Sequence, residues 1–260
     1  MVEKYQFNQV IITKEQMMQH LKALGVSRGM VLLLQCDIKK LPPIAGGIQM
    51  IIDCLIELVG YEGTLVCPTF TPYMCDPSNA SMKMDRNSWK EIRSSMRAFH
   101  KKISLPQNEF AKQFLVNEGV VRSYHPLYSF AAWGKYAKTI CDMHPLHFGL
   151  NEDSPLGKIS ELNGYCVMLG ESFEQSLMFT YVKYRKKNLP IKIVCAPIES
   201  NRVVMWKSML DYELHDHDFS RVKAIMEDKQ IVKKTHLGNA SCLLFNAKEV
   251  DKLAYAYYNK

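Results

Sequence analysis

The stretch that decides the fold runs from Gly29 to Phe70, "GMVLLLQCDIKKLPPIAGGIQMIIDCLIELVGYEGTLVCPTF". It opens with a continuous apolar run, residues 29–36, which is typical of a strand buried on both faces. A loop leads to residues 48–60, whose length and closing glycine predict a helix, and residues 63–70 indicate a second buried strand. Strand, helix and strand within about 40 residues predict a βαβ unit in a mainly parallel sheet.

Other segments of the chain continue the alternation of strands and helices. Thr13 and Gln16 form a capping-box pattern before an amphipathic helix that Gly25 ends, and Ser154 followed by Pro155 predicts another helix start. Further strands are expected at residues 165–170, 191–198, 203–210 and 240–245, and further helices at residues 88–96, 108–115, 175–187 and 247–258. We therefore predict one α/β domain, residues 1–260, a layered α/β/α sandwich with a largely parallel or mixed central sheet and an irregular insert at about 71–118.

The composition is that of a soluble globular protein, with 47% hydrophobic and 23% charged residues in a chain of 260. The longest apolar stretch contains Asp53 and Glu57 and is shorter than the roughly 20 residues that a membrane-spanning helix needs. The N-terminal segment shows no secretory signal. The eight cysteines form no Cys-x-x-Cys pair and lie mostly in apolar runs, as buried thiols do in a reducing compartment. We expect a cytoplasmic protein without a membrane partner or a metal.

The net charge of +7 favours anionic partners such as nucleic acid, an anionic membrane or a phosphate-bearing small molecule. The basic residues are scattered, and short runs such as residues 185–187 are typical of a solvated surface. No nucleic-acid-binding motif accompanies the charge, so nucleic acid is not the expected partner. A nucleic-acid-binding protein remains the minor alternative, and steep salt dependence of binding would reveal it.

Three segments carry residues suited to a ligand site, because parallel α/β sheets bind ligands at the carboxyl ends of strands and near helix N-termini. The first, residues 35–47, joins a strand to a helix through two glycines and predicts an anion site or a plain tight turn. The second, residues 122–134 ("RSYHPLYSFAAWG"), fixes His125 before a proline, as a reactive group or as a structural corner. The third, residues 211–219 ("DYELHDHDF"), suits a metal, an acid–base pair, an acidic surface for a cationic substrate or a solvated acidic loop.

Together these segments resemble the aminoglycoside 3-N-acetyltransferase family, from about Thr13 to the last helix. The resemblance is carried, in chain order, by "AGGIQMIIDCLIELVGYEGTLVCPTFT" (45–71), "SWKEIRSSMRAF" (88–99), "VVRSYHPLYSFAAWG" (120–134), "HPLHFGLNEDSPLGKISELNGYCVMLG" (144–170) and "HDHDF" (215–219). It implies an α/β/α fold and an N-acyltransferase. Such an enzyme transfers the acetyl group of acetyl-CoA to an amine of an aminoglycoside or other amino sugar, by direct attack of the amine on the thioester.

The resemblance also implies which residues hold the pantetheine arm and the phosphates of the cofactor. These are Cys36, Asp37 and Ile38 after the first strand, and His125, Ser129 and Phe130 in the second segment. In this interpretation His125 orients its loop rather than attacking a substrate. The basic balance of the chain suits a phosphate-bearing cofactor.

The first departure from the family pattern follows the first strand. Family members have two serines there, often preceded by His, whereas this chain has Gln35, Cys36 and Asp37. Asp37 brings a carboxylate toward an anionic cofactor, although Lys39 and Lys40 lie close enough in sequence to offset its charge.

The second departure concerns the catalytic base. The family's helix after residue 170 carries a His, with an acidic residue three positions later, and this chain has no His in that helix. Depending on a one-residue gap, the two positions hold Phe179 and Val182, or Thr180 and Lys183. The usual His–acid pair is therefore expected to be missing.

Other groups could replace the missing base or hold the acceptor. The candidate bases are Glu171, Glu174, His215 and His217, and the candidate acceptor-binding residues are Glu213, Asp216 and Asp218. Because a positively charged protein repels a polycation at long range, a phosphate-bearing amino sugar is the preferred acceptor. The alternative is a catalytically impaired family member that binds CoA, a glycan or a partner protein. The oligomeric state stays open, with a homodimer as one option.

Overall fold

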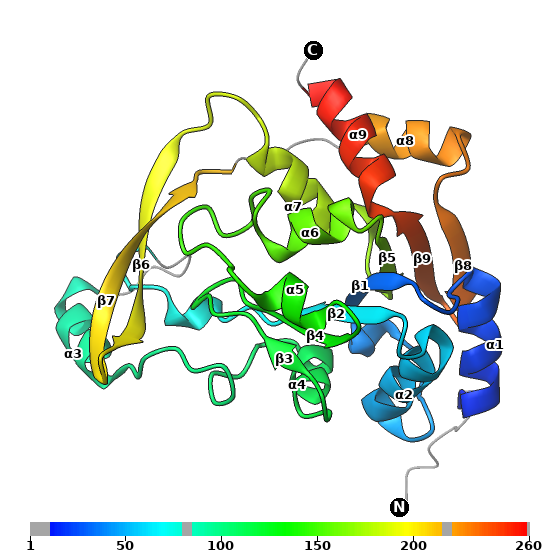
Figure 1. Ribbon diagram of the computed structural model, residues 1–260, viewed down its shortest axis with the longest axis horizontal. Coiled ribbons are helices and arrows are strands. Elements are labelled where there is room, and N and C mark those ends of the chain that lie inside the picture. The colour runs from blue at the N-terminus through cyan, green and yellow to red at the C-terminus, as the bar shows by residue number, and fades with distance from the viewer. Residues whose placement is uncertain (1–10, 80–84, 215–219, 259–260) are drawn as a thin grey trace, which may run out of the picture.

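A mixed β-sheet of seven strands, counted over the described residues, runs through the centre of the protein (Figure 1). The structure is a computed structural model that describes residues 11–79, 85–214 and 220–258. The strand order is β3-β4-β2-β1-β5-β9-β8. These strands are β1 (Val31–Cys36), β2 (Thr64–Pro68), β3 (Val121–Arg122), β4 (Phe130–Gly134), β5 (Tyr165–Leu169), β8 (Lys233–Leu237) and β9 (Ala240–Asn246).

The centre of the sheet is the predicted βαβ unit. β1 runs parallel to β2, with Leu33 beside Val66, and parallel to β5 on its other side, with Leu33 beside Cys166. The crossover between β1 and β2 contains α2 (Gly47–Val59). The other strand pairs are antiparallel, so the sheet is mixed.

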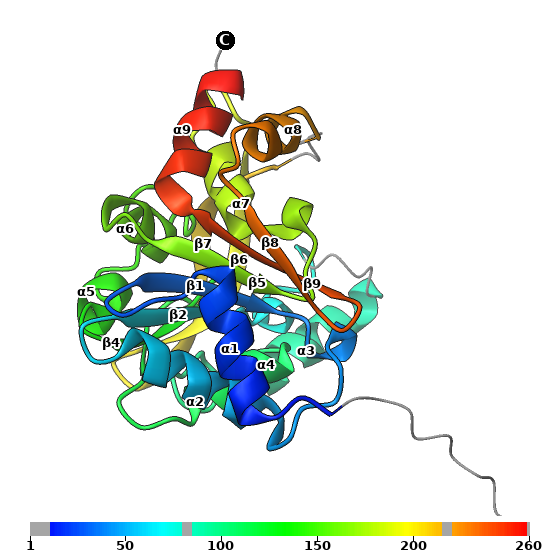
Figure 2. The same cartoon turned by 90° about the vertical axis from the view of Figure 1, so that its right-hand side faces the viewer.

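Helices cover both faces of the sheet, as Figure 2 shows with the sheet between them. One face packs against α1 (Lys14–Leu24), α2 and α4 (Glu109–Leu115). The other face packs against α5 (Ala137–Cys141), α6 (Pro155–Glu161), α7 (Leu177–Tyr184), α8 (Ser220–Asp228) and α9 (Ala247–Tyr258). The predicted α/β layered fold is confirmed, and burial on both faces explains the unbroken apolar run of β1. None of the described helices is long and apolar enough to cross a bilayer.

Local signals in the sequence set several element boundaries. The Thr13 side chain accepts from the backbone N–H of Gln16 and the Gln16 side chain accepts from that of Thr13, which forms the predicted capping box of α1. Gly25 ends α1 in a left-handed conformation, with φ 110°. Ser154 caps α6, and Pro155 is its first residue.

The structure contains several elements that were not expected, among them β3, α5, α8 and β8. The strand β4 was not among the expected strands either, because its five residues, two of them alanines, show no clear periodicity. β6 (Ile191–Ser200) and β7 (Val203–Tyr212) are strands as predicted, but they form a separate hairpin outside the central sheet.

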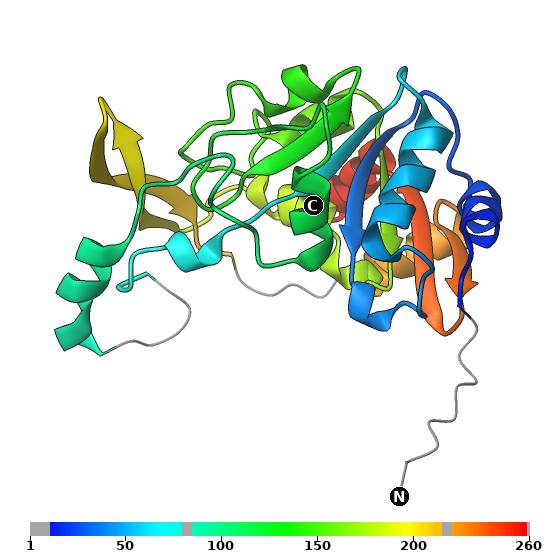
Figure 3. The ribbon, with the colours of Figure 1, turned by 90° about the horizontal axis from the view of Figure 1, so that it is seen from below.

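The insert at 71–118 contains short helical pieces. These are η2 (Pro72–Met74), η3 (Arg86–Ser88), α3 (Trp89–Ser95) and α4. Two other 3₁₀ turns, η1 (Ile38–Lys40) and η4 (Phe173–Gln175), follow β1 and β5. α3 and the hairpin of β6 and β7 lie at the same end of the molecule, away from the central sheet (Figures 1 and 3).

Candidate functional site

A cavity of about 330 Å³, here called the strand-end cavity, opens at the carboxyl ends of β1 and β2. Ligands of α/β sheets bind at this end because the loops that leave parallel strands meet there. The insert closes one side of the cavity, and the loop after β5 closes the other. Its walls include Leu34, Gln35, Cys36, Cys67, Phe70, Asn108, Glu171 and Leu177.

Gln35 joins the end of β1 to the start of α7. Its Nε2 donates to the carbonyl oxygen of Gln175 at 3.0 Å, and its Oε1 accepts from the backbone N–H of Leu177 at 2.9 Å. Leu177 is the first residue of α7, so this bond satisfies one of the helix's free N-terminal amides. The Gln35 amide thus holds the end of β1 and the start of α7 together where both line the strand-end cavity.

A second cavity of about 240 Å³, here called the carboxylate cavity, adjoins the first because Glu171 lines both. Its other charged groups are Glu174, Glu227, Lys223 and Lys234. Three carboxylates and two ammonium groups around one cavity suit a polar ligand that carries amino groups.

The two glutamates on the loop after β5 have different electrostatic surroundings. Partial burial raises the pKa of Glu171 above its ordinary value, and the charge of Asp37 raises it further, against an opposing effect of Lys40. Glu174 instead forms an ion pair with Lys223 at 2.9 Å, which lowers its pKa. Glu171 is therefore the better placed of the two to accept a proton near neutral pH.

A third cavity, here called the loop cavity, has a volume of about 960 Å³ and lies beside the N-terminus of α2. Its lining includes Ile38, Lys39, Lys40 and Gly47. The N-cap position of α2 carries no side-chain hydrogen bond, and a helix N-terminus with nearby lysines favours an anion.

Asp37 lies at the turn between the strand-end cavity and the loop cavity. Its carboxylate accepts from the backbone N–H of Lys39 at 3.2 Å and forms an ion pair with Lys40 at 3.2 Å. The lysine therefore partly offsets the carboxylate's charge. Gly170 packs against this turn with φ 73°, and a Cβ there would lie 2.8 Å from the carbonyl oxygen of Asp37.

The second predicted segment lies inside the protein. His125 is buried, and its Nδ1 accepts from the backbone N–H groups of Leu127 and Tyr128 at 3.1 and 2.9 Å. Ser129 and Phe130 are fully buried, and the Ser129 hydroxyl donates to the carbonyl oxygen of Thr69. None of the three side chains is among those that line the cavities above. His125 orders its loop, and the expected role of the three residues in cofactor binding stays a prediction.

Arg122, at the start of the same segment, is a buried cation that no sequence pattern singled out. Burial lowers the pKa of its guanidinium to about 10. It donates to the side chains of Thr69 and Ser129 and to the carbonyl oxygens of Lys101 and Ser104. Arg122 thus ties the insert to the sheet.

The third predicted segment is only partly described. His215, Asp216, His217 and Asp218 lie outside the described residues. Glu213 is exposed and is not among the residues that line the three cavities. Asp211 is buried, and its carboxylate accepts hydrogen bonds from the hydroxyls of Tyr128 at 2.8 Å and Tyr184 at 2.5 Å. These bonds give Asp211 a structural role in the interior.

The geometry of α7 separates the two pairs of positions at which the resemblance places the His and the acidic residue. Phe179 and Val182 are buried in the core, and Phe179 packs edge-on against Phe173. Thr180 and Lys183 are partly exposed, three positions apart on one side of the helix. A His–acid pair that faced a cavity would therefore fit positions 180 and 183 better than positions 179 and 182.

A mixed α/β sheet with adjoining cavities at its parallel strand ends defines a small-molecule-binding α/β protein. A family model for aminoglycoside 3-N-acetyltransferase matches residues 33–259. The chain belongs to this family, as the sequence predicted.

Individual relatives agree with this assignment. The SPbeta prophage-derived aminoglycoside N(3')-acetyltransferase-like protein YokD of Bacillus subtilis (strain 168) is 32% identical over 95% of this chain and 92% of its own length. The crystal structure of YokD matches with a TM-score of 0.90 over 96% of this chain and 94% of that chain. Aminoglycoside N(3)-acetyltransferase III of Pseudomonas aeruginosa is 25% identical over 93% and 92% of the two chains. A structure of AAC-IIIb in binary complex with CoASH, 19% identical, has the same fold, with a TM-score of 0.82 over 95% and 96%.

Several cavity residues were missed by sequence reasoning. Asn108 carried a detectable signal, because it begins a predicted helix, and its side chain donates to the carbonyl oxygen of Cys36 at 3.0 Å. No sequence signal pointed to the other three, Lys223, Glu227 and Lys234, because they lie at ordinary surface positions of elements far apart in the chain.

Proposed function

We propose that the protein transfers the acetyl group of acetyl-CoA to an amino group of an aminoglycoside or other amino sugar. Family membership supports this reaction class. The Pseudomonas relative is named for aminoglycoside acetylation, and a structural neighbour was solved with CoASH. The observation that carries the proposal is the position of Glu171, which lines both the strand-end cavity and the carboxylate cavity.

The acetyl-CoA fits the residues that follow β1. Lys39, Lys40 and the N-terminus of α2 offer positive charge for the phosphates in the loop cavity. Cys36 lies one residue before this turn and lines the strand-end cavity, where the thioester end is expected. The cofactor supplies the reactive acetyl thioester, and the chain's task is to orient it and exclude water.

The acceptor is proposed to enter the carboxylate cavity. Glu171, Glu174 and Glu227 attract amino groups, while Lys223 and Lys234 suit an acceptor that also carries an anionic group. Fields within about one Debye length, roughly 8 Å, dominate at this range, so the overall positive charge does not exclude a cationic acceptor.

Glu171 is proposed to accept the proton that the attacking amine loses. An amine must be unprotonated to attack a thioester, and a carboxylate whose pKa is raised is a better general base than an ordinary one. Orientation of amine and thioester in adjoining cavities contributes further, since effective molarities reach about 10⁵ M and above. The reaction therefore does not depend on the family's usual His–acid pair.

The test combines binding and turnover in matched variants. Titration calorimetry measures acetyl-CoA binding, and thiol release measures turnover with kanamycin-type drugs and with nucleotide-linked amino sugars. Glu171→Gln should lower kcat by about 10²–10⁴-fold while acetyl-CoA binding stays unchanged. Glu174→Gln is the control, because its carboxylate is already paired with Lys223, and it should lower kcat much less. Full turnover by Glu171→Gln would contradict the assignment.

The second candidate is a non-catalytic, CoA- or glycan-binding member of the family. It is favoured by the absence of a His in the described part of α7 at the family's base position. Clear acetyl-CoA binding without thiol release for any amine of the panel would support this candidate over the enzyme.

A further inference from the structure

The hairpin of β6 and β7 projects from the side of the molecule, away from the central sheet (Figures 1 and 3). The two strands pair along ten residues each and turn at Asn201 and Arg202, which both have positive φ. A two-stranded ribbon has two outer edges, and each carries backbone N–H and C=O groups that need partners.

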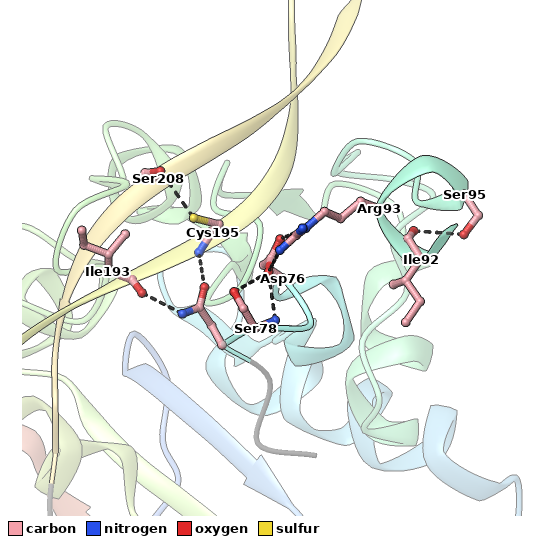
Figure 4. A network of polar contacts seen from close by, with 9 residues as sticks. Asp76, Ser78, Ile92, Arg93, Ser95, Ile193, Cys195 and Ser208 are labelled. Carbon is pink, nitrogen blue, oxygen red and sulfur yellow. Dashed lines mark hydrogen bonds and ion pairs between the residues drawn. The ribbon is translucent and has the colours of Figure 1, made fainter. Parts of the chain in front are cut away.

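The outer edge of β6 is covered by the chain itself. The Asn79 side chain donates to the carbonyl oxygen of Ile193 and accepts from the backbone N–H of Cys195. The N–H groups of Asp76 and Phe99 donate to the carbonyl oxygens of Cys195 and Pro197. Arg93 holds the carboxylate of Asp76 through two bonds of 2.7 and 2.8 Å (Figure 4). The chain therefore covers this edge from the carbonyl oxygen of Ile193 to that of Pro197.

The outer edge of β7 is open over its first half. The residues of β6 whose backbone N–H and C=O groups point away from β7 pair with Val204, Trp206, Ser208 and Leu210. In an antiparallel pair both members of such a non-hydrogen-bonded pair point their backbone groups outward, so these four residues of β7 do so too. Leu210 is satisfied by His147 and Phe148. The outward backbone groups of Val204, Trp206 and Ser208 have no partner within the part of the chain that the structure describes.

This open edge has unusually apolar side chains. Val203, Val204 and Met205 are 64%, 51% and 47% exposed. Proteins normally protect an edge with charges, prolines or a covering segment, and Lys207 is the only charged residue between Val203 and Met209. An apolar β-edge with unpaired amides is suited to being covered by another strand.

We propose that this edge pairs with the same edge of a second copy of the chain, antiparallel about a two-fold axis at Trp206. In that register Trp206 faces the partner's Trp206, and Val204 faces the partner's Ser208. Both are hydrogen-bonded pairs, so every open amide and carbonyl between 204 and 208 is satisfied in both copies. A two-fold contact of this kind is closed, which limits assembly to a dimer.

The charges of the edge favour a second copy over a peptide of another kind. Lys207 faces the partner's Met205 in this register, so no like charges stand directly opposite. A single lysine gives a charged peptide little to recognise. The apolar side chains of one copy, in contrast, lie next to those of the other copy on both sides of the two-fold axis.

The first experiment measures mass against concentration by sedimentation or light scattering, with Val204→Pro as the variant. The Val204 N–H points away from β6, so a proline there removes an intermolecular donor without removing a bond inside the hairpin. The wild type should approach twice the monomer mass as its concentration rises, and Val204→Pro should remain a monomer. Val204→Thr keeps the N–H and should behave as the wild type. A wild type that stays monomeric throughout overturns the proposal.

The second experiment tests the register without depending on a proline. In a hydrogen-bonded antiparallel pair the Cα atoms are about 5.5 Å apart, within the range that a disulfide spans. Trp206→Cys should give a covalent dimer under mild oxidation. Ile191→Cys, exposed on the other strand of the hairpin, should give no more than the wild type. Equal cross-linking of the two variants would overturn the register.

Discussion

At the scale of single residues, the site depends on the charges around Glu171. The pKa of this carboxyl is raised first by burial and then by Asp37, and Lys40 opposes both effects. If Glu171 is the base, it must be ionised to work, so turnover falls as pH drops through its raised pKa. The charges around Glu171, more than the fact that it is a glutamate, then set the pH at which turnover falls on the acid side of the pH–rate profile (its acid limb).

Asp37→Asn should move the acid limb of kcat/KM to lower pH, because it removes a negative charge that raises the pKa of Glu171. The asparagine oxygen can still accept from the Lys39 amide and so preserve the turn. Lys40→Met should move the limb in the opposite direction. A pH–rate profile of both variants checks this, and a limb that stays in place in both would assign the titration to another group.

At the scale of elements, Gln35 connects β1 to α7 through both ends of its amide. Gln35→Leu leaves the Leu177 N–H and the Gln175 carbonyl without partners in a half-buried position. It should lower the free energy of unfolding by about 1–3 kcal/mol in urea titrations. Gln35→Glu keeps the acceptor for Leu177 but loses the donor, so its loss should be smaller. Equal stability of Gln35→Leu and the wild type would show that the bridge contributes nothing.

This bridge also illustrates what the sequence can predict. The βαβ unit and the caps at Thr13 and Ser154 could be predicted, because their signals lie within a few neighbouring residues. The partners of Gln35 lie 140 residues or more away, and their meeting depends on the pairing of β1 with β5. No local pattern encodes that pairing.

The candidate site shows the same division between local and long-range information. The family pattern led to Cys36 and Asp37, and the search for a replacement base led to Glu171; all three lie at or between the cavities. The family pattern also led to Ser129 and Phe130, which are interior residues of this structure. A motif identifies residues that the family shares, but only the folded structure shows whether their side chains face a ligand or the core.

At the scale of the whole molecule, two buried histidines couple stability to pH. The rings of His125 and His144 lie 4.9 Å apart. The Nδ1 and Nε2 atoms of His144 hydrogen-bond to Ser123 and to the carbonyl oxygen of Gly149. Burial lowers the pKa of His144 from 6.5 to about 4, and burial and the neighbouring His144 lower that of His125. Both rings are therefore neutral in the folded protein at neutral pH.

The protein should lose stability on mild acidification, before most carboxylates titrate. Below about pH 6.5 the unfolded chain binds protons at these histidines and the folded chain does not, so unfolding becomes more favourable as pH falls toward 4. For His144 alone the free energy of unfolding should fall by roughly 2 kcal/mol between about pH 7 and pH 5. Urea titrations at both pH values measure the fall, and His144→Gln, which cannot ionise there, should show a smaller one whatever its stability at neutral pH. An equal fall in the variant would mean that His144 does not carry the effect and that other groups set the acid sensitivity.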